Sequence, residues 1–148
     1  MDSISFERKM SVIQTELPLP MTNENDIINI TPQLEKLVME SGISTGILNV
    51  FNAGSTGSII TLEFEPGLLK DIPNFLERII PKKFNYAHEQ TWHDKNGHSH
   101  VRASLLGPSL TVPIKNGRIV HGTWQQIAFI ELDIKSRNRH LIVTILGE

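Results

Sequence analysis

Residues 109–120 read SLTVPIKNGRIV, and this stretch decides the fold class. Apolar and polar side chains alternate over 109–114, which indicates a strand with one buried face. Asn116 and Gly117 follow at the point where a two-residue hairpin turn needs a backbone with positive φ, and an apolar pair then begins the returning strand. The stretch therefore predicts antiparallel β-structure in this half of the chain.

The segments around this hairpin continue the β pattern. Further strands are predicted over 46–51, 58–64, 99–105, 125–132 and 140–146, and residues 4–17 form one or two more β segments that end at Pro18 and Pro20. Most of these strands are joined by short turns, which is typical of antiparallel sheet.

Two stretches instead carry the period of a helix. The first opens at Thr31, whose hydroxyl can cap it, has Pro32 in its first turn and ends at Gly42. The second follows Pro66 and covers 68–80, where Pro73 requires a kink or a late start. We therefore expect an α+β domain built on antiparallel sheet with about two helices, at least one of which covers a sheet face.

Length and charge narrow the class of protein. With 148 residues the chain suits one domain, residues 1–148, and is too short for an (α/β)₈ barrel, which needs roughly 200. A formal net charge of −2 gives no field that would attract nucleic acid or anionic lipid, so neither is expected as a partner.

The chain has no cysteine, which excludes disulfides, thiolate metal sites and cysteine nucleophiles. No apolar run suits a signal sequence or a membrane span, so we expect a soluble, cytoplasmic protein.

Histidines are concentrated in one part of the chain. Four of the six lie between residues 88 and 100, in the stretch YAHEQTWHDKNGHSH. If 98–105 is a strand, successive side chains point to opposite faces, and one face carries a polar row made of His98, His100, Arg102 and Ser104. The other face, with valine, alanine and leucine, then belongs to the core.

The polar row can hold a metal ion. Imidazoles two residues apart on a strand, such as those of His98 and His100, are close enough to bind the same divalent ion. A third ligand could come from His88, His93 or Glu63, and water would take an open position, as in catalytic zinc sites. The alternative is a solvated strand whose histidines only hydrogen-bond their neighbours. The histidine stretch thus predicts a zinc or magnesium site with His88, His98 and His100 as ligands.

Two features could bind a phosphate. Arg102, in the polar row, offers a bidentate grip on phosphate or carboxylate, although an ordinary surface ion pair is the commoner role of an arginine. The loop 54–58 begins with Gly54, Ser55 and Thr56, where backbone N–H groups and hydroxyls can converge on an anion. This loop has no P-loop lysine, so nucleotide binding is weakly supported, and a plain tight connection would need no ligand.

Trp124 and Gln125 stand at the start of a predicted strand. The indole either fills core or a subunit contact, or stacks on a heteroaromatic substrate, and the sequence does not decide between these roles. Elsewhere the familiar catalytic motifs are missing: no nucleophile elbow, Rossmann fingerprint, Walker sequence or His-Glu-x-x-His occurs.

Four runs of this sequence together resemble a known family. They are GHSHVRASLLG at 97–107, SLTVPI at 109–114, NG at 116–117 and GTWQ at 122–125, and they closely resemble the YjbQ-like family, also known as secondary thiamine-phosphate synthases. The match is strong over 88–132 and extends from about 28 to the end. The resemblance implies an α+β fold with a β-sandwich-like core, a homotrimer with histidine-rich pockets near the subunit contacts, and a weak thiamine-phosphate synthase activity.

One departure from the family concerns a histidine. Many members have a His-Thr-Thr-Ala segment ahead of a strand that ends in glutamate, whereas this chain has Gly-Ser-Thr-Gly at 54–57 and retains Glu63. If the missing histidine is a ligand or an acid in other members, this chain uses His88 or His93 instead or has lost the activity. The residues that the resemblance carries over are Glu63, His98, His100, Arg102, Ser104 and the segment 122–125.

The leading hypothesis is an enzyme that joins a pyrimidine diphosphate to a thiazole phosphate and releases pyrophosphate. In this enzyme His98 and His100 hold a divalent metal, and Glu63 is a third ligand or a base. Arg102 and the loop 54–58 bind phosphate. The ligand site is completed by Ser104, Trp124 and Gln125. The expected partner is a small phosphorylated molecule, and the expected assembly is a homotrimer. Two alternatives stay open: a trimeric metal- or anion-binding protein without catalysis, and a metal-dependent hydrolase of phosphate esters.

Overall fold

Eight strands form two antiparallel sheets in residues 9–148, the part of the chain that the computed structural model describes. The strand order is β1-β8-β3-β5-β6 in the five-stranded sheet and β2-β7-β4 in the three-stranded sheet. The strands are β1 (Ser11–Thr22), β2 (Ile27–Asn29), β3 (Thr45–Asn52), β4 (Gly57–Glu63), β5 (Ser109–Lys115), β6 (Arg118–Ile119), β7 (Gln125–Glu131) and β8 (Arg137–Gly147). The predicted α+β class with antiparallel sheets is confirmed.

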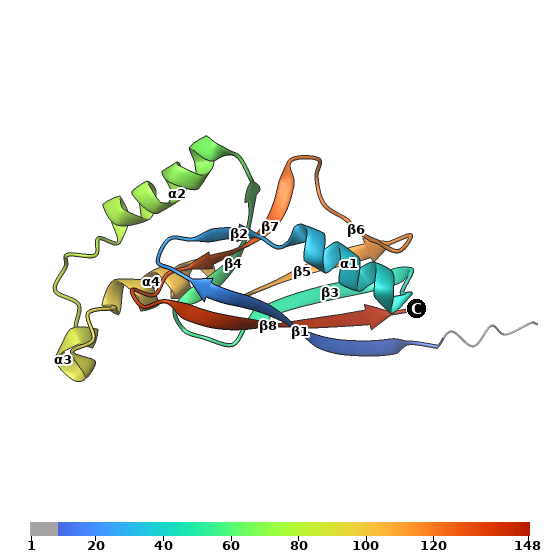
Figure 1. The fold of residues 1–148 in the computed structure, drawn as a ribbon, viewed down its shortest axis with the longest axis horizontal. Helices are drawn as coiled ribbons and strands as arrows, with labels where there is room; N and C mark the ends of the chain where they lie inside the picture. The colour runs from blue at the N-terminus through green and yellow to red at the C-terminus, as the bar shows by residue number, and fades with distance from the viewer. Residues whose placement is uncertain (1–8) are drawn as a thin grey trace, which may run out of the picture.

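Four helices accompany the sheets in the described residues, where about two were expected. They are α1 (Thr31–Ser41), α2 (Pro66–Ile79), α3 (His88–Trp92) and α4 (Gly97–Leu106). In Figure 1, α1 lies over the five-stranded sheet, whereas α2, α3 and α4 gather at the end of the molecule away from the C-terminus. None of the helices described is long and apolar enough to cross a membrane.

The main core lies between the two sheets and α1. Leu48 and Val143 from the larger sheet, Ile127 and Phe129 from β7, and Leu34 from α1 are all fully buried in it. The opposite side of β7 packs in a second cluster with residues of α2 and α4. Because β7 is covered on both sides, its segment 127–130 is a continuous apolar run rather than an alternating one.

The hairpin at 115–118 forms as predicted. Asn116 and Gly117 have φ values of 53° and 73°, and Lys115 pairs with Arg118 across the turn. Positive φ at both central residues gives the turn the twist that matches its two strands. Gly117 is suited to this position because it has no Cβ.

The first strand continues through two prolines. Pro18 and Pro20 were expected to end the β segment, but β1 runs to Thr22. It is an edge strand that pairs only with β8, and its register is irregular between Leu19 and Thr22. Edge strands tolerate proline because one side of their backbone needs no ladder hydrogen bond. The beginning of the predicted segment, up to residue 8, lies outside the described residues.

Both predicted helices form, with differences at their ends. Gly42 closes α1 with φ 71°, as expected, but the hydroxyl of Thr31 does not cap the helix. It instead accepts a hydrogen bond from the Ile127 backbone N–H at 2.7 Å. α2 begins at Pro66 without delay and continues through Pro73.

The predicted strand at 99–105 is wrong, because these residues belong to α4. The buried residues of α4 follow a helical spacing and are Gly97, His98, Ser99, Arg102 and Ala103. The expected core residues Val101 and Leu105 are exposed instead, Leu105 by 70%. Alternation of polar and apolar residues misled the prediction, since the polar side chains of His98 and Arg102 are buried whereas the apolar side chains of Val101 and Leu105 remain at the surface.

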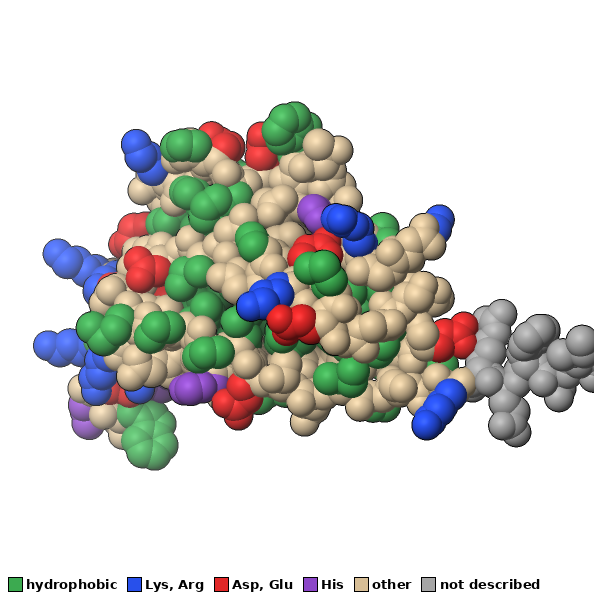
Figure 2. Space-filling view, turned by 45° about the vertical axis from the view of Figure 1, so that its right-hand side comes forward, with side chains coloured by type: hydrophobic (Ala, Val, Ile, Leu, Met, Phe, Trp, Pro, Cys, Tyr) green, Lys and Arg blue, Asp and Glu red, His purple; other side chains and the backbone are tan. Residues whose placement is uncertain are grey.

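Exposed apolar side chains occur on α4 and on other elements of the structure. Figure 2 shows them in small groups among charged side chains over one face of the molecule. The exposed set includes Phe75 and Ile79 of α2 together with Leu105. Near these residues α2 and α4 border an apolar cavity of about 530 Å³.

Candidate functional site

The helix α4 separates the polar side chains of residues 98–104, which a strand would have placed in one row. Residues four apart lie on the same side of a helix, whereas residues two apart point about 200° apart. His98 and Arg102 therefore share the buried side of α4, and His100 and Ser104 share its outer side. The single polar row predicted for 98–104 does not exist.

His98 lies in the interior, away from the other histidines of the segment. Its side chain is 1% exposed, and its Nε2 is 2.9 Å from Oε1 of Glu24, which precedes β2. Glu24 also accepts a hydrogen bond from Lys82 Nζ at 2.6 Å. Burial alone would raise the pKa of Glu24, but the hydrogen bonds from Lys82 and His98 together hold this pKa below its usual value. His98 thus joins α4 to the segment before β2.

Arg102 is also turned inward. The side chain is 2% exposed, and its Nε and Nη2 donate to the carbonyl oxygen of Ile80 at 3.0 and 2.7 Å. Nη2 also donates to Oε2 of Glu77 at 2.7 Å. These bonds join α4 to the end of α2, and Arg102 lines neither of the two cavities described next.

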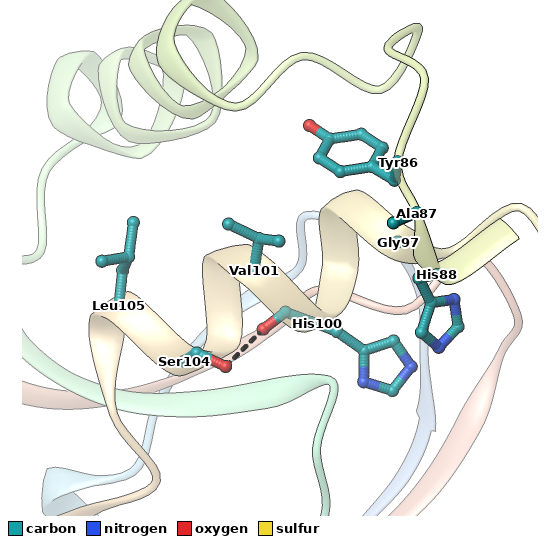
Figure 3. Close-up of a pocket in the computed structure, with 8 residues that line it drawn as sticks. All are labelled: Tyr86, Ala87, His88, Gly97, His100, Val101, Ser104 and Leu105. Carbon is teal, nitrogen blue, oxygen red and sulfur yellow. Dashed lines mark hydrogen bonds between the residues drawn. The ribbon is translucent and has the colours of Figure 1, made fainter. Parts of the chain in front are cut away.

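His100 and Ser104 stand between two cavities. The larger, of about 470 Å³, is drawn in Figure 3 and is lined by Tyr86, Ala87, His88, Gly97, His100, Val101, Ser104 and Leu105. The smaller, of about 190 Å³, is lined by Gly54, Ser55, Gly57, His100, Ala103, Ser104 and Pro108. Ser104 donates its hydroxyl hydrogen to the carbonyl oxygen of His100 at 2.8 Å, as the dashed line in Figure 3 marks.

The smaller cavity joins two features that are distant in the sequence. It brings Gly54 and Ser55 of the glycine-serine loop to the outer side of α4, where His100 and Ser104 lie. The loop leads into β4, and β4 is attached to α4 by the hydroxyl of Ser58, which donates to a backbone carbonyl of the helix at 3.3 Å. Four of the residues predicted for the site thus meet at one place.

The environment of His100 lowers the pKa of its imidazole and so favours the uncharged ring. Burial is the largest cause, and the neighbouring His88 adds to it, so the pKa of His100 lies below its usual value despite the opposing effect of Asp94. The ring centroids of His88 and His100 are 4.5 Å apart. A neutral imidazole in this position can act as a hydrogen-bond partner, a base or a metal ligand.

Thr56, the third candidate of the loop, faces the interior rather than the cavity. Its hydroxyl donates to Oδ2 of Asp133 at 3.0 Å and accepts from Nη2 of Arg139 at 3.0 Å. Arg139 also binds Glu131, and both carboxylates, Glu131 and Asp133, are fully buried. These charged groups form the support of the loop.

The buried charged residues that support the loop were not predicted from the sequence, although the sequence contains a pattern that indicates them. Glu131 and Asp133 are acidic residues at the end of an otherwise apolar run, and arginines follow at 137 and 139. Burial alone would raise the pKa of Asp133, but hydrogen bonds from Arg137, the Lys135 backbone and Thr56 outweigh it and lower this pKa. Acids placed at the end of a buried strand require such partners.

Three potential metal ligands lie together beside the larger cavity, which one of them, His88, lines. Ligand atoms of His88, Glu89 and Asp94 all lie within 4.8 Å of one another. Glu89 and Asp94 were not among the residues predicted from sequence, because strand geometry directed attention to His98. The exposed His93 ends α3 in a left-handed conformation and is not part of the group.

The family model described as "UPF0047 protein YjbQ-like" matches residues 15–148. This chain belongs to the YjbQ-like UPF0047 family. The resemblance inferred from the runs at 97–125 is thereby confirmed.

Relatives in the family cover nearly the whole chain. A UPF0047 protein of Methanothermobacter thermautotrophicus is 44% identical over 139 residues, 94% of this chain and 95% of the relative. The UPF0047 protein YugU of Bacillus subtilis is 30% identical, over 88% of this chain and 97% of YugU. A crystal structure from Sulfolobus solfataricus, described as a YbjQ-like protein of unknown function, matches with a TM-score of 0.88 and 36% identity, covering 95% of this chain and all of that one.

In this YjbQ-like protein Gly54 stands where the resemblance implies a histidine in many family members. A Cβ added there would come within 2.9 Å of Nη1 of Arg139, so a side chain would require the guanidinium to move. The imidazole that lies beside His100 is that of His88.

The remaining predicted residues of the YjbQ-like site lie elsewhere in the chain. Glu63 pairs with Gln125 at one end of the β4–β7 ladder, whereas Gly57 pairs with Glu131 at the other. Six residues of strand separate these ends by about 20 Å. Trp124, in the turn before β7, is 73% exposed. Within one chain, these residues are therefore not brought to the cavities beside His100.

Proposed function

We propose that this protein binds a phosphorylated small molecule in the two cavities beside α4 and catalyses the reaction of secondary thiamine-phosphate synthases. In that reaction a nitrogen of the thiazole phosphate forms a bond to the methylene carbon of the pyrimidine diphosphate, while the carbon–oxygen bond to the leaving pyrophosphate breaks. One observation carries the proposal: His100 and Ser104 line both cavities.

Two adjoining cavities suit a reaction of two organic substrates. Holding both reactants in contact removes much of the entropic barrier to joining them. The larger cavity, of about 470 Å³, falls within the size range of small-molecule sites, and its Tyr86, Val101 and Leu105 suit a heteroaromatic ring. The smaller has the hydroxyl of Ser55 and the backbone of Gly54 in its wall, which suit phosphate oxygens.

His100 is the side chain that we assign to the reacting centre. It borders both cavities, and its lowered pKa favours the neutral ring, which carries one N–H and one nitrogen lone pair. An N–H aimed at the leaving pyrophosphate would stabilise the charge that grows there as the carbon–oxygen bond breaks. Arg102 takes no part in this assignment, since its guanidinium is bound to Ile80 and Glu77.

The test combines product analysis with a matched pair of histidine variants. The purified protein is incubated with pyrimidine diphosphate, thiazole phosphate and a divalent metal salt, and the joined product and pyrophosphate are quantified. We expect His100→Ala to lower kcat/KM by about 10²–10³-fold. His140→Ala, an exposed histidine on β8 that lines neither cavity, should leave it unchanged. Equal activity of His100→Ala and the wild type would overturn the assignment.

A second candidate function is ligand binding without catalysis. It is favoured by the distance of Glu63 and Trp124 from the cavities within one chain. Under this candidate, phosphorylated compounds raise the melting temperature of the protein, by mass action, while no joined product forms. Release of phosphate from a single substrate would instead indicate a phosphate-ester hydrolase and contradict both.

We also propose that the protein assembles as a homotrimer, as the family resemblance implies. The exposed apolar side chains of Phe75, Ile79 and Leu105 support this, since apolar patches of this kind are typical of contacts between subunits. Light scattering on the eluting protein should give a mass near three times 16.7 kDa. A mass of one chain at micromolar concentration would contradict the proposal.

A further inference from the structure

Three potential metal ligands meet beside the larger cavity, and only one of them, His88, was among the ligands predicted from the sequence. His88 and Glu89 begin α3, and Asp94 lies in the connection between α3 and α4. We propose that His88, Glu89 and Asp94 bind one divalent transition-metal ion of the zinc type. This site replaces the pairing of His98 with His100 that strand geometry predicted.

The distances between ligand atoms fit this ion. Nδ1 of His88 is 3.4 Å from Oδ1 of Asp94 and 3.8 Å from Oε1 of Glu89. Ligands bonded to zinc at 2.0–2.1 Å in a tetrahedral arrangement are separated by about 3.3 Å. An imidazole with two carboxylates also favours zinc over magnesium, which prefers oxygen ligands and retains its waters.

His88 has an unused ligand atom. Its Nδ1 is buried and makes no hydrogen bond within the described residues, although Oδ1 of Asp94 at 3.4 Å and Oε1 of Glu89 at 3.8 Å lie within ion-pair distance. Buried polar atoms in folded proteins nearly always have a partner. A bound ion would satisfy this nitrogen and both carboxylates at once.

The carboxylates are held in place by hydrogen bonds from the following loop. Glu89 accepts from the backbone N–H of Lys95 at 2.5 Å and from that of Gly97 at 2.7 Å. The buried side-chain amide of Asn96, oriented to donate, lies 2.8 Å from Oδ1 of Asp94. Partners of this kind orient ligating groups in metal sites and leave other lone pairs free for the ion.

The position of this site connects it with the cavities. His88 lines the larger cavity. Its ring centroid is 4.5 Å from that of His100, which borders both cavities. None of the residues lining either cavity, all within the described range, is a lysine or an arginine. An ion at His88 would supply positive charge for a phosphorylated ligand. This last step rests on the proposed function, whereas the ligand geometry does not.

Metal binding is tested on the full chain without any organic substrate. Protein stripped with a chelator is titrated with zinc by calorimetry, and the retained metal is measured by mass spectrometry after dialysis. We expect one zinc ion per chain and a higher melting temperature with zinc. His88→Ala and Asp94→Asn should each weaken zinc binding by at least about 100-fold. His140→Ala, which removes an exposed imidazole elsewhere, should bind zinc as the wild type does.

The outcomes separate this inference from the proposed function. No stoichiometric zinc in the wild type, or unchanged affinity in both His88→Ala and Asp94→Asn, would overturn the metal site. Melting curves without metal verify that each variant is folded, and the isosteric Asp94→Asn covers the case in which His88→Ala does not fold. Zinc binding without synthase activity would leave the metal site standing and reject the reaction.

Discussion

Replacement of Arg139 with alanine is expected to lower the free energy of unfolding by about 3–5 kcal/mol. Arg139 donates from Nε and Nη2 to the two carboxylate oxygens of Glu131 at 2.7 and 2.5 Å, and Glu131 is fully buried. Without the guanidinium, a charged carboxylate remains inside the protein with only neutral hydrogen-bond donors, such as the hydroxyl of Thr22. Urea denaturation followed by circular dichroism measures the loss.

Two further variants make this prediction specific. Arg118→Ala removes an exposed arginine on β6 and should change the stability by no more than about 0.5 kcal/mol. Glu131→Gln combined with Arg139→Ala should recover part of the loss, because no buried charge is then left unpaired. If Arg139→Ala alone costs less than about 1 kcal/mol, the ion pair is not a support of the structure.

Loss of Arg139 should also disturb the smaller cavity. Its Nη2 donates to the carbonyl oxygen of Thr56 at 3.2 Å, and the loop 54–58 is thereby tied to the buried carboxylates. Under conditions where Arg139→Ala is folded, we therefore expect weaker binding of phosphorylated compounds, measured as a smaller shift in melting temperature.

Replacement of Arg102 with alanine is expected to cost about 2–4 kcal/mol of stability without removing the binding site. The substitution leaves a cavity and deprives the buried carbonyl oxygen of Ile80 of both its hydrogen bonds from Arg102. The strand-based hypothesis predicts the opposite: a surface arginine whose loss spares stability and abolishes phosphate binding. Urea denaturation together with ligand-induced thermal shifts distinguishes the two.

A neighbour on the same helix provides the control. Val101→Ala shortens an exposed side chain on the other side of α4 and should cost less than about 1 kcal/mol. If Arg102→Ala is as stable as Val101→Ala and no longer responds to phosphorylated compounds, the interior role of Arg102 is wrong.

Much of the β-structure was predictable because its causes are local. The hairpin at Asn116 and Gly117 depends on residues that adopt positive φ, and the end of α1 at Gly42 has the same origin. The family could also be inferred from short runs, and the family model bears this out. Gly54, Ser55, His100 and Ser104, predicted separately, do line one cavity.

The helix α4 was not predictable from its own pattern. Its segment alternates polar and apolar residues as a half-buried strand does, yet it buries His98 and Arg102 and exposes Leu105. Burial of these polar groups depends on Glu24, which is 74 residues away, and on Ile80, which is 22 residues away. Periodicity within a segment carries no information about such partners.

By itself, the sequence determined the fold class, the hairpin, the ends of several helices and strands, and the family, since turn residues, hydrophobic patterns and short motifs act locally. The tertiary structure alone decided which histidines meet. Because a helix turns residues two apart to different sides, His100 lies beside His88 and near Asp94, whereas His98 is buried against Glu24. The choice between these arrangements was made by contacts between distant segments, which supply partners for buried polar groups.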